Sequence, residues 1–249
     1  PNMQRRRQCS KPNGAHQQHG VCAGGWGMNI AYNMDCMEYM RTLPDKAFDL
    51  AVVDPPYGIG ESGSKNHTRG KLAVAKNYKA FAGNDTQPPT PMYFEQLTRV
   101  SKNQIIFGAN HFADKIPNPA SSCWIVWDKE NGNTDFADCE LAWTSFKSAV
   151  RIFRFRWQGM LQGNMAEKEQ RIHPTQKPIA LYTWIYQRYA KPGDKILDTH
   201  LGSGSSRIAA YDAGLDFVGC EIDPDYFAAQ EARYQAHVAQ MSLFVEGNT

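Results

Sequence analysis

From Met28 onward, apolar and polar positions follow two periods, one typical of strands and one typical of helices. Apolar runs bounded by turn residues predict strands over residues 29–33, 48–53, 103–109, 123–129, 139–145, 150–157, 195–200 and 216–223. Stretches with one apolar face predict helices over residues 35–43, 91–102, 177–190, 205–214 and 224–238. Strands that alternate with helices indicate βαβ units, so the pattern predicts an α/β fold with a mostly parallel sheet.

The composition is that of an ordinary globular chain. Its 249 residues, 42% hydrophobic and 21% charged, are enough for one α/β core. No apolar run approaches the ~18 residues of a membrane span, and we expect no secretory signal. Six cysteines without a CxxC pair indicate reduced thiols and a cytoplasmic protein. Residues 1–27 lack periodicity, so we expect a flexible N-terminal arm before a folded domain over residues 28–249.

The net charge of +2 indicates no class of partner, but the basic residues are concentrated in two segments. The loop 58–80 carries five basic residues against one acid, and the segment 151–157 interleaves Arg151, Arg154 and Arg156 with aromatic residues. Basic segments with aromatic residues suit a nucleic-acid backbone and unstacked bases. A solvated loop and an ordinary strand with one polar face are the alternatives, and the sequence leaves both open.

The stretch FDLAVVDPPYGIG ends an apolar strand with an acid, two prolines and an aromatic residue. Pro55 and Pro56 each fix their own φ and push the preceding residue out of the helical region. Asp54 and Tyr57 are therefore expected in fixed directions on a stiff, extended turn at the end of the strand. Taken alone, the tetrapeptide is equally typical of a proline-rich turn without a function.

A second candidate lies in KILDTHLGSGSSRIAA, where a glycine-bearing loop joins a strand to a helix and can direct backbone N–H groups to a ligand. Glu221 ends the next strand, the place from which an acid binds ribose hydroxyls. Together these features indicate an adenosine-containing cofactor. Gly204 is not followed by the third glycine of the dinucleotide pattern, which weakens that interpretation, and a tight turn without a ligand is the simpler alternative.

Four motifs in this order resemble one family: DPPY at 54–57, HPTQKP at 173–178, DTHLGSGSS at 198–206 and VGCEIDPDYF at 218–227. The chain is similar to S-adenosylmethionine-dependent DNA amino-methyltransferases of the permuted β-class, from about residue 28 to about residue 238. The resemblance implies a Rossmann-like, doubly wound sheet of seven mostly parallel strands, one of them antiparallel, with helices on both faces. It also implies a target-recognition region at about residues 120–170, and the class is often dimeric, so a homodimer is one expectation.

The resemblance implies a set of cofactor-binding residues. Asp198, Gly202 and Gly204 would line the methionine end, while Glu221 would bind the ribose. The remaining members are Asp35 near the adenine, Thr175 and Lys177 at the cofactor's carboxylate, His200 and Asp223. For Asp35 a helix N-cap is an equally good interpretation. Thr199 and His200 replace the family's proline and phenylalanine, and the imidazole predicts cofactor affinity that depends on pH near neutrality.

The resemblance also gives the tetrapeptide a chemical role. An exocyclic amino group on a base is a poor nucleophile because its lone pair is delocalised into the ring. Asp54 and the carbonyl of Pro55 can accept its two hydrogens, Pro56 holds that carbonyl, and Tyr57 would stack on the base. No metal is required, and the base must be flipped out of double-stranded DNA, with the loop 58–80 closing on the duplex.

Several alternatives stay open. Asp54 in first position favours adenine N6 over cytosine N4, which is the nearest rival. Methylation of RNA or of a protein glutamine usually goes with Asn at that position. A non-catalytic DNA-binding relative and a nicotinamide-dependent oxidoreductase are rivals of another class, and the second leaves DPPY without a role. The sequence specifies neither the recognition site nor whether a restriction enzyme accompanies the protein.

Overall fold

The computed structural model describes residues 19–20, 27–60, 85, 87–132, 137–158, 161–166 and 168–246, with side chains described to residue 241. A nine-stranded sheet runs in the order β1-β2-β11-β10-β3-β4-β6-β5-β7. Its strands are β1 (His19–Gly20), β2 (Asn29–Asn33), β3 (Phe48–Val53), β4 (Ser101–Phe107), β5 (Trp124–Asp128), β6 (Cys139–Thr144), β7 (Arg151–Arg154), β10 (Lys195–Asp198) and β11 (Asp216–Glu221). A separate hairpin joins β8 (Trp157–Gln158) to β9 (Leu161–Gln162).

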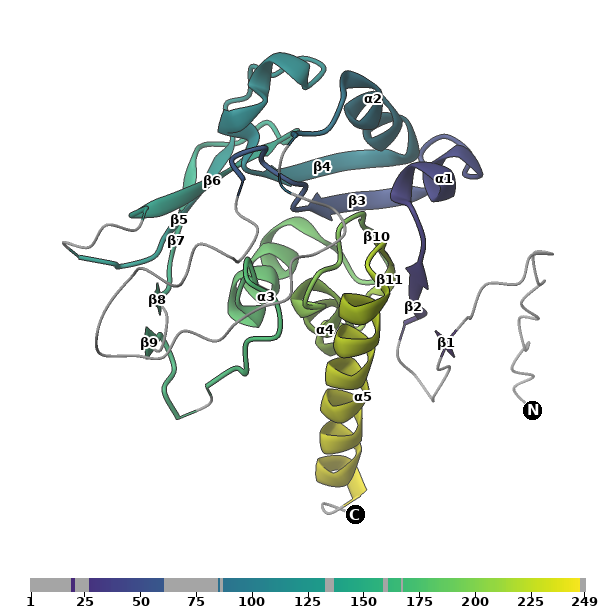
Figure 1. Cartoon of the computed structure of the whole chain (residues 1–249), viewed down its shortest axis with the longest axis vertical. Coiled ribbons are helices and arrows are strands. Elements are labelled where there is room, and N and C mark those ends of the chain that lie inside the picture. Colours follow the sequence, from purple (N-terminus) through teal and green to yellow (C-terminus); the bar gives the residue numbers. More distant parts are fainter. Residues whose placement is uncertain are drawn as a thin grey trace.

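Helices cover both faces of the sheet, as Figure 1 shows. They are α1 (Cys36–Arg41), α2 (Pro91–Val100), α3 (Ile179–Tyr189), α4 (Ser205–Asp212) and α5 (Pro224–Glu246), with short 3-10 turns at Ala109–His111 and Ala113–Lys115. Successive residues of β3 alternate between the faces: Leu50 and Val52 pack with α3, α4 and α5, while Ala51 and Val53 pack with α1 and α2. In the described part of the chain, no helix is both long and apolar enough to cross a membrane.

The expected doubly wound α/β architecture is confirmed, with two additions. The seven strands from β2 to β5 in the sheet order form the expected core, in which β6 runs antiparallel to its neighbours β4 and β5. Two further strands extend this core, β1 beside β2 and β7 beside β5. The sheet therefore has nine strands where the resemblance implied seven, because β1 and the alternating segment 150–157 each add an edge strand outside the core.

Several predicted boundaries are wrong. The helix predicted over 224–238 continues as α5 to Glu246, and the strand predicted over 150–157 is divided into β7 and β8. A third case lies between α2 and β4. The pattern placed the helix over 91–102, but α2 ends at Val100 and β4 begins at Ser101. Ser101 has extended dihedrals, and its hydroxyl donates to the carbonyl of Leu97, which closes the last turn of the helix. Its pairing with Phe48 then starts the β3–β4 ladder, so tertiary pairing determines the boundary rather than helical periodicity.

The sheet topology brings distant motifs to one edge. β10 lies between β11 and β3, and the chain leaves β10 toward β11 but leaves β3 toward β4, so the strand order reverses between β10 and β3. Ligands of open α/β sheets bind at such a reversal, beyond the carboxyl ends of the strands. Asp54 follows β3 and Asp198 ends β10, so both lie at this position. Because β6 is antiparallel, its first residues, including Glu140, lie at the same edge.

Candidate active site

The DPPY turn (residues 54–57) holds its acid and its aromatic residue against each other. The Tyr57 hydroxyl donates to Asp54 Oδ1 over 2.7 Å. Burial raises the pKa of Asp54, which Lys177 opposes, and burial together with Asp54 raises the pKa of Tyr57 well above its usual value. The phenol therefore stays protonated and remains a hydrogen-bond donor to the carboxylate.

The Lys177 ammonium lies in the same site as Asp54 and Tyr57. Its ammonium, with a side chain only 4% exposed, donates to Asp54 Oδ2 over 2.5 Å and to the Tyr57 hydroxyl over 3.2 Å. It also lies 3.1 Å from Glu140 Oε2. The ammonium therefore contacts three polar groups, two of them through hydrogen bonds. These contacts place Lys177 beside the predicted catalytic acid, and its role at the cofactor's carboxylate stays a prediction.

Glu140 is a residue of this site that the sequence pattern did not identify. Its Oε1 lies 2.5 Å from Lys129 Nζ and its Oε2 faces Lys177, so positive and negative groups alternate from Lys129 to Asp54. Although burial opposes it, the two lysines hold the pKa of Glu140 at about 2. Burial also works against the charge of Lys177, but the carboxylates of Asp54 and Glu140 raise the pKa of its ammonium. The only sequence signal was an acid within the apolar strand segment CELAWT.

The Tyr57 ring packs directly against Gly108, where a side chain would leave no space for it. The ring of Tyr57 stacks on His111, with centroids 5.2 Å apart and an 18° interplanar angle. A Cβ on Gly108 would lie 2.1 Å from the Tyr57 ring, and Gly108 has φ +67°, in the left-handed region. One face of the ring is therefore covered by His111, so only the other face remains for the predicted stacking on a base.

The glycine loop (residues 198–206) is organised around Asp198, which is buried. Asp198 Oδ1 accepts the backbone N–H of His200 over 3.1 Å, and Oδ2 accepts the hydroxyl of Ser206. Burial raises the pKa of Asp198 to about 7 against these two hydrogen bonds, and the charges of Asp54 and Glu221 add to the rise. Gly202 and Gly204 both have positive φ, at +51° and +73°, which the tight turn into α4 requires.

Glu221 joins this loop to the next strand. Its two oxygens accept the backbone N–H groups of Gly202 (2.8 Å) and Asp223 (2.9 Å). Burial raises the pKa of Glu221, which these amides oppose. Asp223 in turn accepts from the N–H groups of Asp225 and Tyr226 at the start of α5. Glu221 ends its strand as predicted, whereas Asp223 lies beyond β11 and not within the strand predicted over 216–223. Both acids also hold the backbone of the site in place.

His200 and Thr199, the two departures from the family pattern, are bonded to each other and to α2. The Thr199 hydroxyl lies 2.6 Å from the Tyr93 hydroxyl and 2.9 Å from His200 Nδ1, and the rings of Tyr93 and His200 meet edge to face. Burial lowers the pKa of His200 to about 4. Burial outweighs the opposing charge of Asp35, which favours a neutral ring near neutral pH rather than the titration that the sequence predicted.

Two other predicted cofactor residues have local roles. The Asp35 side chain accepts the N–H of Met37 over 2.7 Å as the N-cap of α1, so the helix-cap interpretation is confirmed. Thr175 donates its backbone N–H to His173 Nδ1, and its hydroxyl lies 3.1 Å from the same atom. Burial lowers the pKa of His173 to about 4, and its ring packs on Tyr226.

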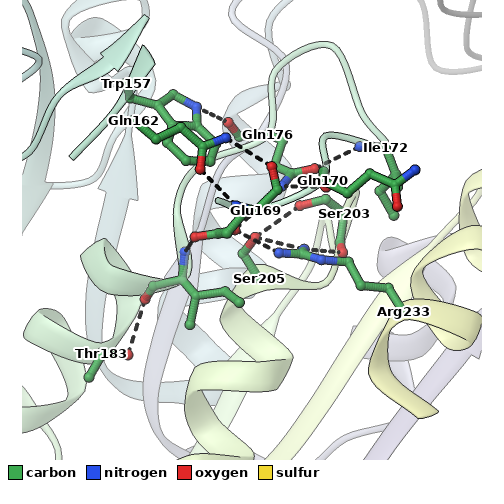
Figure 2. Close-up of polar contacts among 11 residues, drawn as sticks. Trp157, Gln162, Glu169, Gln170, Ile172, Gln176, Thr183, Ser203, Ser205 and Arg233 are labelled. Atoms are coloured by element: carbon green, nitrogen blue, oxygen red, sulfur yellow. Dashed lines mark hydrogen bonds and ion pairs between the residues drawn. The ribbon is translucent and has the colours of Figure 1, made fainter. Parts of the chain in front are cut away.

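An ion pair ties the segment before α3 to the glycine loop, as Figure 2 shows. Arg233 of α5 donates to the Ser203 carbonyl and the Ser205 hydroxyl, and its other nitrogen bonds Glu169 Oε2 over 2.7 Å. Glu169 Oε1 accepts the N–H of Ile179 at the start of α3. This ion pair, which the sequence pattern did not indicate, connects the HPTQKP segment and the glycine loop.

The predicted DNA-contacting arginines lie at two different edges of the sheet. β7 runs parallel to β5, so Arg151, its first residue, lies at the edge away from Asp54, while Arg154 and Arg156 lie toward the site. Arg154 forms an exposed pair with Asp128 (3.4 Å). The aromatic residues between them pack inward, for example Phe153 against Trp184 of α3. Of the loop 58–80, only residues 58–60 lie within the described part of the chain, and the arm 1–27 is described only at residues 19–20 and 27.

The residues around the glycine loop fit the cofactor that the sequence resemblance implies. Glu221 ends a strand beside the loop, where a ribose can meet a carboxylate. Asp198 and Glu221 are bonded by amide and hydroxyl groups, so their negative charge suits a ligand with a sulfonium and an ammonium group. The capping hydrogen bond of Asp35 uses one of its carboxylate oxygens, so the other stays available to a ligand.

Comparisons with known proteins agree on one family. The sequence profile of the DNA methylase family (N6/N4 type) matches residues 76–232, a range that starts after the DPPY turn. The Type II methyltransferase M.HinfI of Haemophilus influenzae is 23% identical over 258 residues, covering 83% of this chain and 68% of the relative. The crystal structure of the M1.HpyAVI–SAM complex has a TM-score of 0.52 at 20% identity, covering 82% of this chain and 98% of that chain. The PvuII DNA methyltransferase (cytosine-N4-specific) has a TM-score of 0.53 at 13% identity, covering 83% and 86% of the two chains.

Proposed function

The chain belongs to the DNA methylase family, and from this premise we propose that it transfers a methyl group from S-adenosylmethionine to the N6 amino group of an adenine in double-stranded DNA. The observation that supports this most directly is the position of Asp54 and Asp198 on adjacent strands at the reversal of the sheet. There the predicted catalytic turn faces the same edge as the predicted cofactor loop, as a transfer between two bound molecules requires.

In this proposal the DPPY turn activates the amino group of a flipped-out base. Asp54 and the carbonyl of Pro55 accept hydrogen bonds from its two hydrogens, which draws the nitrogen toward a tetrahedral geometry and exposes its lone pair. After the methyl group is transferred, the nitrogen loses one of these protons to the Asp54 carboxylate. Tyr57 fixes the orientation of the carboxylate through its 2.7 Å hydrogen bond. S-adenosylmethionine, when bound, supplies the methyl group on a sulfonium, which is a good leaving group and removes the need for a metal.

The cofactor would be held by the glycine loop and the strand that follows it. Glu221 would bind the ribose hydroxyls through lone pairs not used by its two backbone amides, and Gly202 and Gly204 allow the backbone to approach closely. Asp198, His200 and Asp223 would shape the loop and the entrance to α5. Thr175 remains a candidate for the cofactor's carboxylate, since its side chain is exposed next to His173.

Adenine rather than cytosine is proposed because an acid stands first in DPPY, as is usual for adenine enzymes. Cytosine N4 is the second candidate, because the cytosine-N4-specific PvuII enzyme has a similar fold. Arg154 and Arg156, at the same edge as Asp54, are the proposed phosphate or base contacts, with the loop 58–80 closing on the duplex. A homodimer remains a proposal from the family.

One assay tests the reaction and the base together. The protein is incubated with labelled S-adenosylmethionine and methylation-free genomic DNA, the DNA is digested, and the labelled nucleoside is identified, with Asp54→Ala in parallel. N6-methyladenine that is lost in the variant is the expected result. Labelled N4-methylcytosine would keep the mechanism and replace the base. No labelled nucleoside, from protein shown to be folded and to bind cofactor, would contradict the proposed reaction.

A further inference from the structure

The charged groups behind Asp54 form a continuous buried chain. Lys129 Nζ lies 2.5 Å from Glu140 Oε1, Glu140 Oε2 lies 3.1 Å from Lys177 Nζ, and Lys177 Nζ lies 2.5 Å from Asp54 Oδ2. Two cations and two anions alternate, so the chain as a whole carries no net charge. Buried charges are tolerated when they are paired in this way, and the pairing links Glu140 on β6 to the catalytic acid on β3.

One oxygen atom in this row of charged groups, Glu140 Oε2, lacks a hydrogen bond from any described residue. Among the described residues, Glu140 Oε2 is a buried acceptor without a hydrogen-bonding partner, because Lys177, although within ion-pair distance, does not meet the geometry of a hydrogen bond. A buried carboxylate oxygen in this state is costly. A small movement of the Lys177 ammonium toward Glu140 would satisfy it.

The proposed reaction brings a further hydrogen-bond donor to Asp54, and such a movement would make room for it. Tyr57 occupies Asp54 Oδ1 and Lys177 occupies Oδ2, yet Asp54 must accept a hydrogen from the target amino group. If Lys177 shifts from Asp54 Oδ2 toward Glu140 Oε2, the catalytic oxygen becomes more accessible and the ammonium keeps a carboxylate partner. Without Glu140, the same shift would leave the ammonium without a second carboxylate.

We propose that Glu140 is a positioning residue of the methyl transfer: it holds the Lys177 ammonium beside Asp54 and retains it when Asp54 Oδ2 turns to the amino group of the base. This inference rests on the proposed function for its role in turnover. The contact of Glu140 with Lys177 and its charge effect on Asp54 do not depend on that function. A carboxylate that only neutralises Lys129 is the alternative to be excluded.

The charges around Asp54 predict in which direction its pKa moves when Glu140 is replaced, which a purely structural role of Glu140 does not predict. The groups that face Asp54 are Lys177 and Tyr57, Glu140 from β6, Asp198 from β10, Tyr93 from α2 and Tyr182 from α3. Removing the negative charge of Glu140 lowers the pKa of Asp54, because a like charge no longer disfavours the carboxylate. Since Asp54 acts as the ionised acceptor, the acidic limb of the rate profile should move to lower pH.

The test compares Glu140→Gln with Glu140→Asp and with Glu95→Gln, an exposed glutamate on α2. The pH dependence of kcat is measured on DNA, and the Asp54 carboxylate is titrated by 13C NMR without DNA or cofactor. We expect Glu140→Gln to lower kcat about tenfold and to shift the Asp54 midpoint to lower pH. Glu140→Asp, which keeps the charge but is one methylene shorter, should lower kcat with a midpoint near that of the wild type. Glu95→Gln should match the wild type in both.

Two results would overturn the inference: a kcat of Glu140→Gln within about twofold of wild type, or an unmoved Asp54 midpoint in that variant. If Glu140→Gln does not fold, unchanged turnover in Glu140→Asp overturns it instead. The NMR titration separates this inference from the proposed function. In a protein without methyl transfer, a shifted midpoint would still support the charge coupling of Glu140 to Asp54, and an unshifted one would refute it.

Discussion

The two acidic regions at the carboxyl edge of the sheet stabilise buried carboxylates in different ways. Behind the DPPY turn, Asp54 and Glu140 are paired with the ammonium groups of Lys177 and Lys129. In the glycine loop, Asp198 and Glu221 are bonded by backbone amides and a hydroxyl. The pKa values follow this difference in part: the lysines hold the pKa of Glu140 at about 2 and burial raises that of Asp198 to about 7, while burial raises the pKa of Asp54 despite Lys177.

This difference separates the two proposed tasks. A site compensated by its own cations keeps an acceptor ready for a neutral amino group without attracting other cations. A site compensated only by dipoles retains a negative field that a cationic cofactor can complete. The same residue type therefore serves as a hydrogen-bond acceptor in one region and as part of an electrostatic cradle in the other.

The largest effect is expected from removing the cation that the first region depends on. Lys177→Met removes the ammonium paired with Asp54 and one of the two paired with Glu140, which keeps Lys129. We expect this loss to cost about 3–5 kcal/mol of unfolding free energy and to abolish methyl transfer near neutral pH. Lys102→Met is the matched control, because Lys102 pairs with Asp49 at the surface and its side chain is 57% exposed. That loss should stay below about 1 kcal/mol. Equal denaturation midpoints for the two variants would contradict the comparison.

The next prediction concerns the geometry of the first region rather than its charge. Gly108→Ala forces a left-handed φ on alanine and places a methyl group 2.1 Å from the Tyr57 ring. Gly132→Ala shares the first problem, with φ +62°, but no atom lies within 4 Å of its new Cβ. We expect the control to cost about 1 kcal/mol and Gly108→Ala to cost more and to lower kcat at least about tenfold. Equal activity in both variants would show that the position of Tyr57 does not matter.

The sequence predicted the elements of both regions, but not how their side chains pair. Strand and helix periods located most elements to within one or two residues, and the DPPY, HPTQKP and glycine motifs identified Asp54, Lys177 and Asp198. The pairing of Lys177 with Glu140 required knowing that β6 is antiparallel, which no local pattern shows. The bond between Tyr93 and Thr199 joins residues 106 positions apart, and Glu169 meets Arg233 from 64 positions away. Such contacts depend on the assembled sheet, so sequence periodicity does not predict them.

The opposite pKa shifts predict opposite dependences of stability on pH. Asp198 binds its proton more tightly when folded, so its contribution to stability falls as pH rises from about 4 to about 7, by up to about 4 kcal/mol. Glu140 is more acidic when folded, so its contribution rises as pH increases from about 2 to about 4. Urea titrations at several pH values should show that Asp198→Asn removes the first slope and Glu140→Gln the second. A stability difference between wild type and Asp198→Asn that is constant from pH 4 to 7 would contradict the first prediction.

The smallest effect is expected at His200, where the glycine loop departs from the family. Its buried ring has a pKa of about 4 and stays neutral above about pH 5, so the affinity for S-adenosylhomocysteine measured by calorimetry should show no step attributable to His200 near pH 6.5. His200→Phe removes the hydrogen-bond partner of the Thr199 hydroxyl, which also contacts Tyr93. We expect a change of about 1 kcal/mol in affinity, with the same pH profile as the wild type. Thr199→Val alone and combined with His200→Phe should show non-additive losses, because the two side chains share one hydrogen bond. A step near pH 6.5 that disappears in His200→Phe would show instead that the imidazole is charged in the bound state.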